Sequence, residues 1–189
     1  GEPNIGFVDW NPRPVDESMG IFREVRVLTS GEVEMADAAV HSKVNTETLD
    51  EAWLTVEARL TNNSGEAVTG QLKGVLEGQT FSIPVSLAAG EAKVVKVTSE
   101  EAGLLHLKNP RLWWCQNMGK PEMYSMDLAF EVNGKVSDKE TVDFGVREVK
   151  DYLTEEGARG FLLNGKKVLV RSAGWTDDIF LRDTPESNE

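Results

Sequence analysis

The sequence has little of what builds a metal site or a disulfide framework. It contains one cysteine, Cys115, among 189 residues, so no disulfide can form within the chain. Its two histidines, His41 and His106, lie far apart, and no group of residues has the spacing of zinc ligands. We therefore expect no structural metal, and the sequence predicts no cofactor.

Basic residues are also scarce. The 20 lysines and arginines are outnumbered by 32 aspartates and glutamates, which leaves a net charge of −12 at pH 7. Such a surface repels nucleic-acid phosphates and anionic lipid headgroups, so neither nucleic acid nor membrane is an expected partner. No run approaches the roughly 18 consecutive apolar residues of a membrane span, and the opening GEPNIGFVDW lacks the basic start and apolar middle of a signal peptide.

Alternation of apolar and polar residues dominates from about residue 24 to 150, which is typical of strands with one buried face. It is clearest in WLTVEARLT and returns in QTFSIPVSL and MYSMDLAFEV. Because each segment has one apolar and one polar face, we expect half-buried antiparallel strands. The predicted inward residues of these strands are Leu54, Val56, Ala58, Leu60, Phe81, Ile83, Val85, Leu87, Tyr124, Met126, Leu128, Phe130 and Val132.

Turn signals separate these segments. They lie at residues 62–65, at 89–91 and at Asn133 and Gly134, where a two-residue hairpin needs positive φ at both positions. Short strands at this spacing predict an all-β fold, an immunoglobulin-like antiparallel β-sandwich with non-globular or partly ordered flanking segments. Since a disulfide is excluded, apolar burial must hold the sheets together. The core candidates are Trp53, Phe81, Leu128, Phe130 and Phe144.

Two adjacent tryptophans, Trp113 and Trp114, fall outside the alternation, in a run rich in Asn, Pro and Gly. One hypothesis is that their rings form a platform on which a sugar stacks. The alternative is structural: one ring closes an end of the sandwich and the other packs on an adjoining domain. Neighbouring residues of an extended segment point in opposite directions, which favours the structural alternative.

Both ends of the chain depart from the strand pattern. Residues 1–23 contain the run DWNPRPVDE, which favours an irregular loop, and the charged segment DYLTEEGARG at 151–160 predicts a flexible linker. The following FLLNGKKVLVRSAGW predicts a second Asn-Gly hairpin, at 164–165, and then an apolar strand over 168–170. We expect the two ends to belong to neighbouring domains of a longer protein.

Four runs carry a resemblance to a known family. They are VDWNPRPVDESMGIFREVRV at 8–27, NPRLWWCQNMGKPEMY at 109–124, DFGVRE at 143–148 and FLLNGKKVLVRSAGWTDDIFLR at 161–182. Together, and in this order, they resemble glycoside hydrolase family 2, in which a jelly-roll sugar-binding domain, an immunoglobulin-like sandwich and a catalytic TIM barrel follow one another. The DWNP and GWTDDIFLR motifs are most similar to the exo-β-glucosaminidase and β-mannosidase branch.

The resemblance implies three parts. Residues 1–27 would be the C-terminal end of the jelly roll, 28–148 the sandwich, and 149–189 a linker with the first hairpin and strand of a truncated barrel. The implied activity is retaining hydrolysis of β-glycosides by two carboxylates, one protonating the leaving oxygen and the other attacking the anomeric carbon. Both would belong to barrel strands beyond residue 189, so we expect no catalytic residue in this chain.

By the same resemblance the chain would be an inert spacer between its own jelly-roll and barrel domains, in a periplasmic or secreted enzyme. The expected ligand of the intact enzyme is a β-linked oligosaccharide or glycoside, and the sequence does not separate glucosaminide, mannoside and galactoside. Two other functions stay open. One is a free-standing carbohydrate-binding sandwich that grips sugar with Trp113 and Trp114, and the other is a cell-surface adhesion module.

The resemblance also implies substrate-binding residues in the intact enzyme. Asp9 matches a jelly-roll acid that contacts the non-reducing sugar, with Trp10 beside it, whereas the alternative for Asp9 is capping of a turn. Trp175 and Asp178 follow the expected barrel strand, and barrel enzymes build their sites at the carboxyl ends of strands. A tryptophan offers an apolar plane to a sugar, and a carboxylate accepts hydroxyl hydrogen bonds. The alternative for Trp175 is packing at the barrel rim.

Overall fold

The computed structural model describes residues 24–171, and Thr29–Val170 form one compact unit. The described part is built of strands and one short 3-10 helix, with no α-helix, and no helix within it is long and apolar enough to cross a membrane. In chain order the elements are β1 Val33–Val44, β2 Glu51–Asn62, β3 Val68–Leu76, β4 Gln79–Leu87, β5 Ala92–Val97, η1 Gly103–Leu105, β6 His106–Lys108, β7 Tyr124–Val132, β8 Lys135–Phe144, β9 Val149–Leu153, β10 Arg159–Leu163 and β11 Lys166–Val168.

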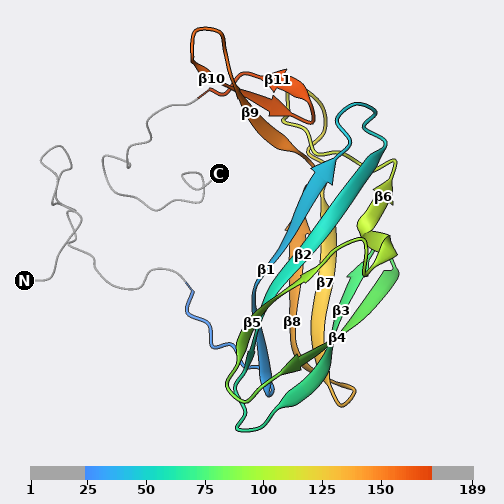
Figure 1. Ribbon diagram of the computed structural model, residues 1–189, viewed down its shortest axis with the longest axis vertical. Helices are drawn as coiled ribbons and strands as arrows, with labels where there is room; N and C mark the ends of the chain where they lie inside the picture. Colours follow the sequence, from blue (N-terminus) through green and yellow to red (C-terminus); the bar gives the residue numbers. More distant parts are fainter. Residues whose placement is uncertain (1–23, 172–189) are drawn as a thin grey trace, which may run out of the picture. The chain divides into compact units, whose positions relative to one another are not determined.

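Two antiparallel sheets form a sandwich (Figure 1). The first sheet has the order β1-β2-β5, with β6 also paired to β2, and the second has the order β4-β3-β7-β8. The chain changes sheet between β2 and β3, between β4 and β5, and again before β7. Such crossovers split neighbouring strands between the layers, as in immunoglobulin-like sandwiches. The predicted all-β antiparallel sandwich is confirmed.

The hairpins show why this sequence turns where it does. Asn133 and Gly134 join β7 to β8 with φ of 50° and 76°, and the pair at 164–165 joins β10 to β11 with φ of 48° and 78°. Both predicted Asn-Gly hairpins are therefore confirmed. A third tight turn, at Glu77 and Gly78, has φ of 48° and 78° and joins β3 to β4. This turn was not predicted, because glutamate is not a usual residue at the first turn position.

The core lies between the two sheets and consists of the alternating residues of their inner faces. Four of the five core candidates are buried, since Phe81, Leu128, Phe130 and Phe144 are exposed by 7, 1, 0 and 6%. Packing around Phe130 is close. A Cβ added at Gly70 would lie 2.6 Å from two carbons of the Phe130 ring, so the small residue on β3 makes room for the large one on β7.

Trp53 is not a core residue, and the prediction that placed it there was wrong. Leu54 and Val56 on the same strand are buried in the core. Successive side chains of a strand point to opposite faces, so Trp53 points to the outer face of β2 together with Glu57. On that face its indole stacks on His106, with ring centroids 5.1 Å apart and an interplanar angle of 13°.

Side chains of β8 close the free edge of β1. The register of β7 and β8 shifts between Asp138 and Val136, which leaves Ser137 unpaired in the ladder. The Ser137 hydroxyl accepts a hydrogen bond from the Val33 N–H and donates one to the Val33 carbonyl, both at 2.9 Å, and Asp138 Oδ2 accepts from the Met35 N–H at 2.8 Å. These bonds join the two sheets along one edge and satisfy strand groups that would otherwise face water.

A third sheet, of order β11-β10-β9, lies at one end of the sandwich (Figure 1). It corrects two predictions. Residues 151–160 are not a flexible linker throughout, because parts of this segment lie in β9 and β10, which pair as an antiparallel hairpin. The apolar strand predicted over 168–170 ends at Val168, whose partner on β10 is Phe161, and Leu169 beyond it is 79% exposed.

Candidate functional site

The predicted substrate-binding residues Asp9, Trp10, Trp175 and Asp178 lie outside the described residues, so the geometry of this proposed site stays a prediction. Other regions of the described part also have polar or aromatic side chains in close contact. They include the junction between the sandwich and the third sheet, where Trp113 and Trp114 lie, and the outer face of the first sheet around Trp53.

At the junction, other parts of the chain contact both tryptophan rings. The Arg147 guanidinium lies 4.3 Å from the centre of the Trp113 ring, and the Lys166 ammonium lies 4.9 Å from the centre of the Trp114 ring. Added Cβ atoms at Gly145 and Gly119 would come within 2.8 Å of Trp113 and 2.9 Å of Trp114. The rings therefore pack on backbone and bind cations within the chain. This packing favours the structural role over the sugar platform.

Two buried polar side chains hold the junction together. Glu148 and Asn164 are only 8% and 1% exposed. Asn164 Oδ1 accepts from the Glu148 N–H at 2.8 Å, its Nδ2 donates to the Trp113 carbonyl at 3.0 Å, and its own N–H donates to the Glu148 carbonyl at 2.8 Å. One asparagine thus connects the β10–β11 turn to the end of the sandwich and to the Trp113 loop.

Glu148 extends this network to the first sheet. Its Oε2 accepts a hydrogen bond from the Val44 N–H at the end of β1 at 2.9 Å, and its Oε1 forms an ion pair with the Lys150 ammonium. Burial by itself would raise the pKa of this carboxyl, but the bonds from Lys150 and Val44 outweigh it, so the pKa lies below the ordinary value. The carboxylate is therefore ionised at neutral pH.

The lowered pKa of Glu148 predicts a loss of stability in acid. A carboxylate whose folded-state pKa is depressed stabilises the fold above its unfolded pKa, roughly 4.3, and the contribution is lost as the pH falls through the lower folded-state value. We expect Glu148→Gln to reduce the pH dependence of urea stability between about pH 5 and pH 3. Glu156→Gln, on an exposed turn residue, should leave it unchanged. An unaltered slope in the Glu148 variant would contradict this account.

The outer face of the first sheet carries a cavity of about 440 Å³. Trp53 and Thr55 of β2 line it, with His41 and Lys43 of β1 on one side. On the other side lies the segment that follows β5, residues 98–101. This cavity was not predicted from the sequence, because Trp53 was expected in the core. The alternation of β2 did contain the information, because it puts Trp53 on the face opposite to that of the buried Leu54.

No group of three or more residues among 24–171 is placed to hold a metal ion. Glutamates on the two outer sheet faces form ion pairs across strands, such as Glu57 with Lys96 and Glu131 with Lys73, each at 2.6 Å. Pairing of this kind neutralises surface charge and contributes little to stability. These glutamates belong to the surface of the sandwich.

The sequence model of a known protein family, the glycosyl hydrolases family 2, matches residues 33–147. This span runs from the start of β1 through β8 to Arg147, next to the Glu148 junction. The chain belongs to glycosyl hydrolase family 2. The resemblance seen in the sequence is confirmed.

Relatives of this family 2 chain include exo-β-D-glucosaminidases. That of Streptomyces avermitilis is 40% identical over 178 residues, which cover 94% of this chain and 20% of the relative. That of Amycolatopsis orientalis is 41% identical over 179 residues, which cover 95% of this chain and 17% of the relative. A mannosylglycoprotein endo-β-mannosidase of Lilium longiflorum is 29% identical over 177 residues, which cover 88% of this chain and 18% of the relative. These names bear out the predicted branch.

The fold agrees with solved structures of the family. The crystal structure of Amycolatopsis orientalis exo-chitosanase CsxA matches with a TM-score of 0.80 and 40% identity, over 97% of this chain and 21% of that chain. A family 2 β-galacturonidase from Eisenbergiella tayi matches with a TM-score of 0.57 and 18% identity, over 73% of this chain and 22% of that chain, which shows the shared fold alone. The family 2 chain thus spans about a fifth of the length of the curated relatives named above.

Proposed function

We propose that this chain is the central region of an exo-acting retaining β-glycosidase that cleaves β-linked glucosaminides. One observation carries the proposal: 40% identity over 94% of the chain to an exo-β-D-glucosaminidase. The aligned region extends beyond the sandwich on both sides, since it covers 178 residues whereas the family model matches only residues 33–147. The proposal selects glucosaminide from the three sugars that the sequence left open.

Within that enzyme we place three parts. Residues 1–27 are proposed to end a sugar-binding jelly roll, 28–148 to form the sandwich, and 149–189 to lead into a TIM barrel. Asp9 and Trp10 are proposed to contact the non-reducing sugar from the first part. Trp175 and Asp178 are proposed to contact it from the last, because barrel strands present their carboxyl ends to the substrate.

The proposed role of the sandwich is to set the position of the domains on either side of it. A spacer does this only if its ends are fixed to its body, since a misplacement of about 1 Å near the chemistry can reduce the rate about 10²-fold. The bonds of Glu148 and Asn164 supply such a fixation at the C-terminal end. They join the third sheet to β1 and to the Trp113 loop through buried hydrogen bonds, which are costly to break.

The proposal predicts that the 189-residue chain by itself hydrolyses nothing. Retaining hydrolysis needs two carboxylates about 5 Å apart, and we propose that both belong to the barrel. The purified chain should therefore show no turnover of 4-nitrophenyl β-D-glucosaminide above buffer, whereas a longer protein that includes the barrel should cleave it. Turnover by the chain alone would reject the spacer role, and a longer protein that is inactive on glucosaminides would reject the substrate.

In the longer protein Asp9→Ala should lower kcat/KM by about 10² or more, because a charged hydrogen bond to a sugar hydroxyl is lost in the transition state. Lys73→Ala is the control, since the Lys73 ammonium pairs with Glu131 on the outer face of the second sheet. Unaltered kcat/KM in the Asp9 variant would leave this residue as a turn cap.

A further inference from the structure

The outer-face cavity of the first sheet is built around one tryptophan. In the strand register Trp53 of β2 stands between Lys43 of β1 and His106 of β6. His106 stacks on the indole but does not line the cavity, whereas Trp53, Lys43 and Thr55 do. The tryptophan therefore has His106 on one side and the cavity beside it. A half-buried indole that stacks on a neighbouring ring is a rigid apolar plane next to a cavity.

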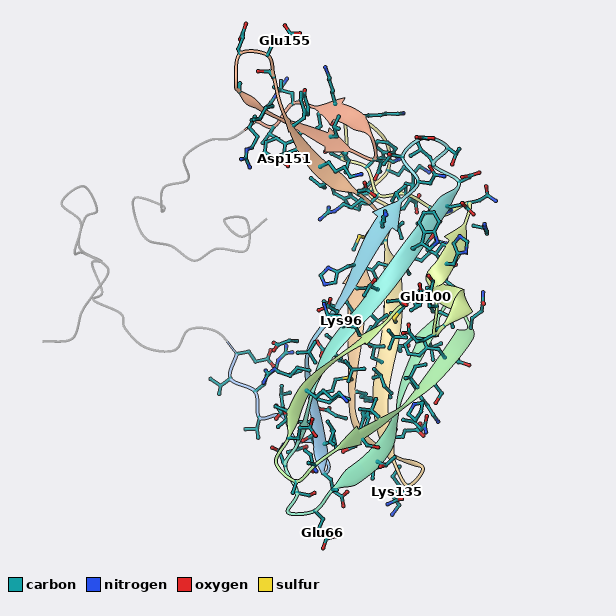
Figure 2. All side chains as sticks on the ribbon, viewed as in Figure 1. Glu66, Lys96, Glu100, Lys135, Asp151 and Glu155 are labelled. Atoms are coloured by element: carbon teal, nitrogen blue, oxygen red, sulfur yellow. The ribbon has the colours of Figure 1, made fainter. Side chains whose placement is uncertain are left out.

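The polar groups around this plane come from two sides. Glu100 and Glu101 follow the end of β5 and are both exposed, and Figure 2 labels Glu100 beside the first sheet. Glu101 Oε2 accepts hydrogen bonds from the Thr98 N–H at 2.8 Å and from the Thr98 hydroxyl at 2.5 Å. These bonds lower the pKa of Glu101, and they fix the loop that carries both carboxylates.

Across the cavity from this loop lies β1, with His41 and Lys43 exposed on the same face. The cavity thus has carboxylates on one side, an ammonium donor on the other and an indole in its lining. Ligand sites commonly combine apolar walls and a few polar groups that fix orientation, in volumes of about 300 to 1,000 Å³. The volume of about 440 Å³ falls within this range.

We propose that this outer-face cavity binds a β-linked amino sugar, a glucosamine unit of an oligosaccharide, as an accessory site. The apolar face of a pyranose ring lies on Trp53, its ammonium group faces Glu100 and Glu101, and its hydroxyl oxygens accept from Lys43. The choice of amino sugar rests on the proposed function. The net charge of −12 also attracts a polycationic oligosaccharide to the whole chain.

In the experiment, the 189-residue chain is titrated with the β-1,4-linked glucosamine tetramer. Binding is measured by calorimetry and by changes in the amide NMR signals of Thr55 and Glu100. We expect binding with a Kd of about 1 mM or tighter. Cellotetraose, which has the same linkage and a hydroxyl in place of each ammonium, should bind several-fold more weakly. Equal binding of the two sugars would reject the ammonium–carboxylate contact.

Two pairs of variants locate the binding. Trp53→Ala should weaken it about tenfold or more, whereas Trp114→Ala, at the junction, should not. Glu100→Gln should weaken binding of the glucosamine tetramer about threefold or more and leave the affinity for cellotetraose unchanged. Glu66→Gln, a matched exposed glutamate on the turn after β2, should change neither. If Trp53→Ala loses structure, Trp53→Phe keeps an aromatic plane and should retain part of the affinity.

The outcomes separate this proposal from the proposed function. If the chain does not bind the tetramer, or if Trp53→Ala does not weaken the binding, the accessory site is rejected even if the longer protein cleaves glucosaminides. Binding that depends on Trp53 and Glu100 would support the site even if the longer protein proved inactive on them.

Discussion

Replacement of Phe130 by alanine is expected to lower the free energy of unfolding of the chain by about 3 to 5 kcal/mol. Phe130 is fully buried, so the change removes a large apolar group from the core and leaves a cavity. Gly70 on β3 packs against the ring, and β7, which is paired to β3 on one side and to β8 on the other, can move little to fill the space. A loss of this size is a large part of the stability of a typical domain. Urea unfolding followed by fluorescence measures it.

The control is Trp53→Ala. Trp53 has a similar aromatic area but lies on the outer face, where it stacks on His106. Its loss should cost about 1 kcal/mol, in keeping with an aromatic pair outside the core. If the two variants were destabilised equally, the assignment of the β2 faces would be wrong.

Replacement of Asn164 by alanine is expected to weaken the attachment of the third sheet to the sandwich. Asn164 is 1% exposed and its side chain accepts from the Glu148 N–H and donates to the Trp113 carbonyl. Alanine leaves both groups without their partner, and a buried group without a partner costs about 1 to 3 kcal/mol. Amide hydrogen exchange of β10 and β11 should therefore accelerate about tenfold or more, while exchange in β2 changes less.

The chain offers a matched control for this change. Asn133 occupies the same position of the other Asn-Gly hairpin, with φ of 50° against 48° for Asn164, and it is exposed. Asn133→Ala therefore carries the same backbone cost without the buried hydrogen bonds. Equal acceleration of exchange at the two hairpins would show that only the turn conformation matters, and that the junction does not depend on the asparagine side chain.

Much of the fold could be predicted from the sequence because it follows from local patterns. The alternation in β2, β4 and β7 defined the inner faces, and Phe81, Leu128 and Phe130 proved buried. The Asn-Gly pairs marked two hairpins, since these residues accept positive φ at low cost. The family, too, could be inferred from short runs. Each of these conclusions depends on neighbours in the sequence.

The tertiary structure decided what depends on residues far apart. Glu148 resembles a surface glutamate in the sequence, yet it is buried in the fold, where the Val44 N–H and the Lys150 ammonium bind its carboxylate. Asn164 was predicted as a turn residue, and only the packing of the Trp113 loop gives its amide a second partner. The cavity beside Trp53 exists because β1 and the segment after β5 flank β2 on opposite sides of its outer face. Alternation sets the face to which a side chain points, but the partners it meets there depend on how the strands are ordered in the sheet.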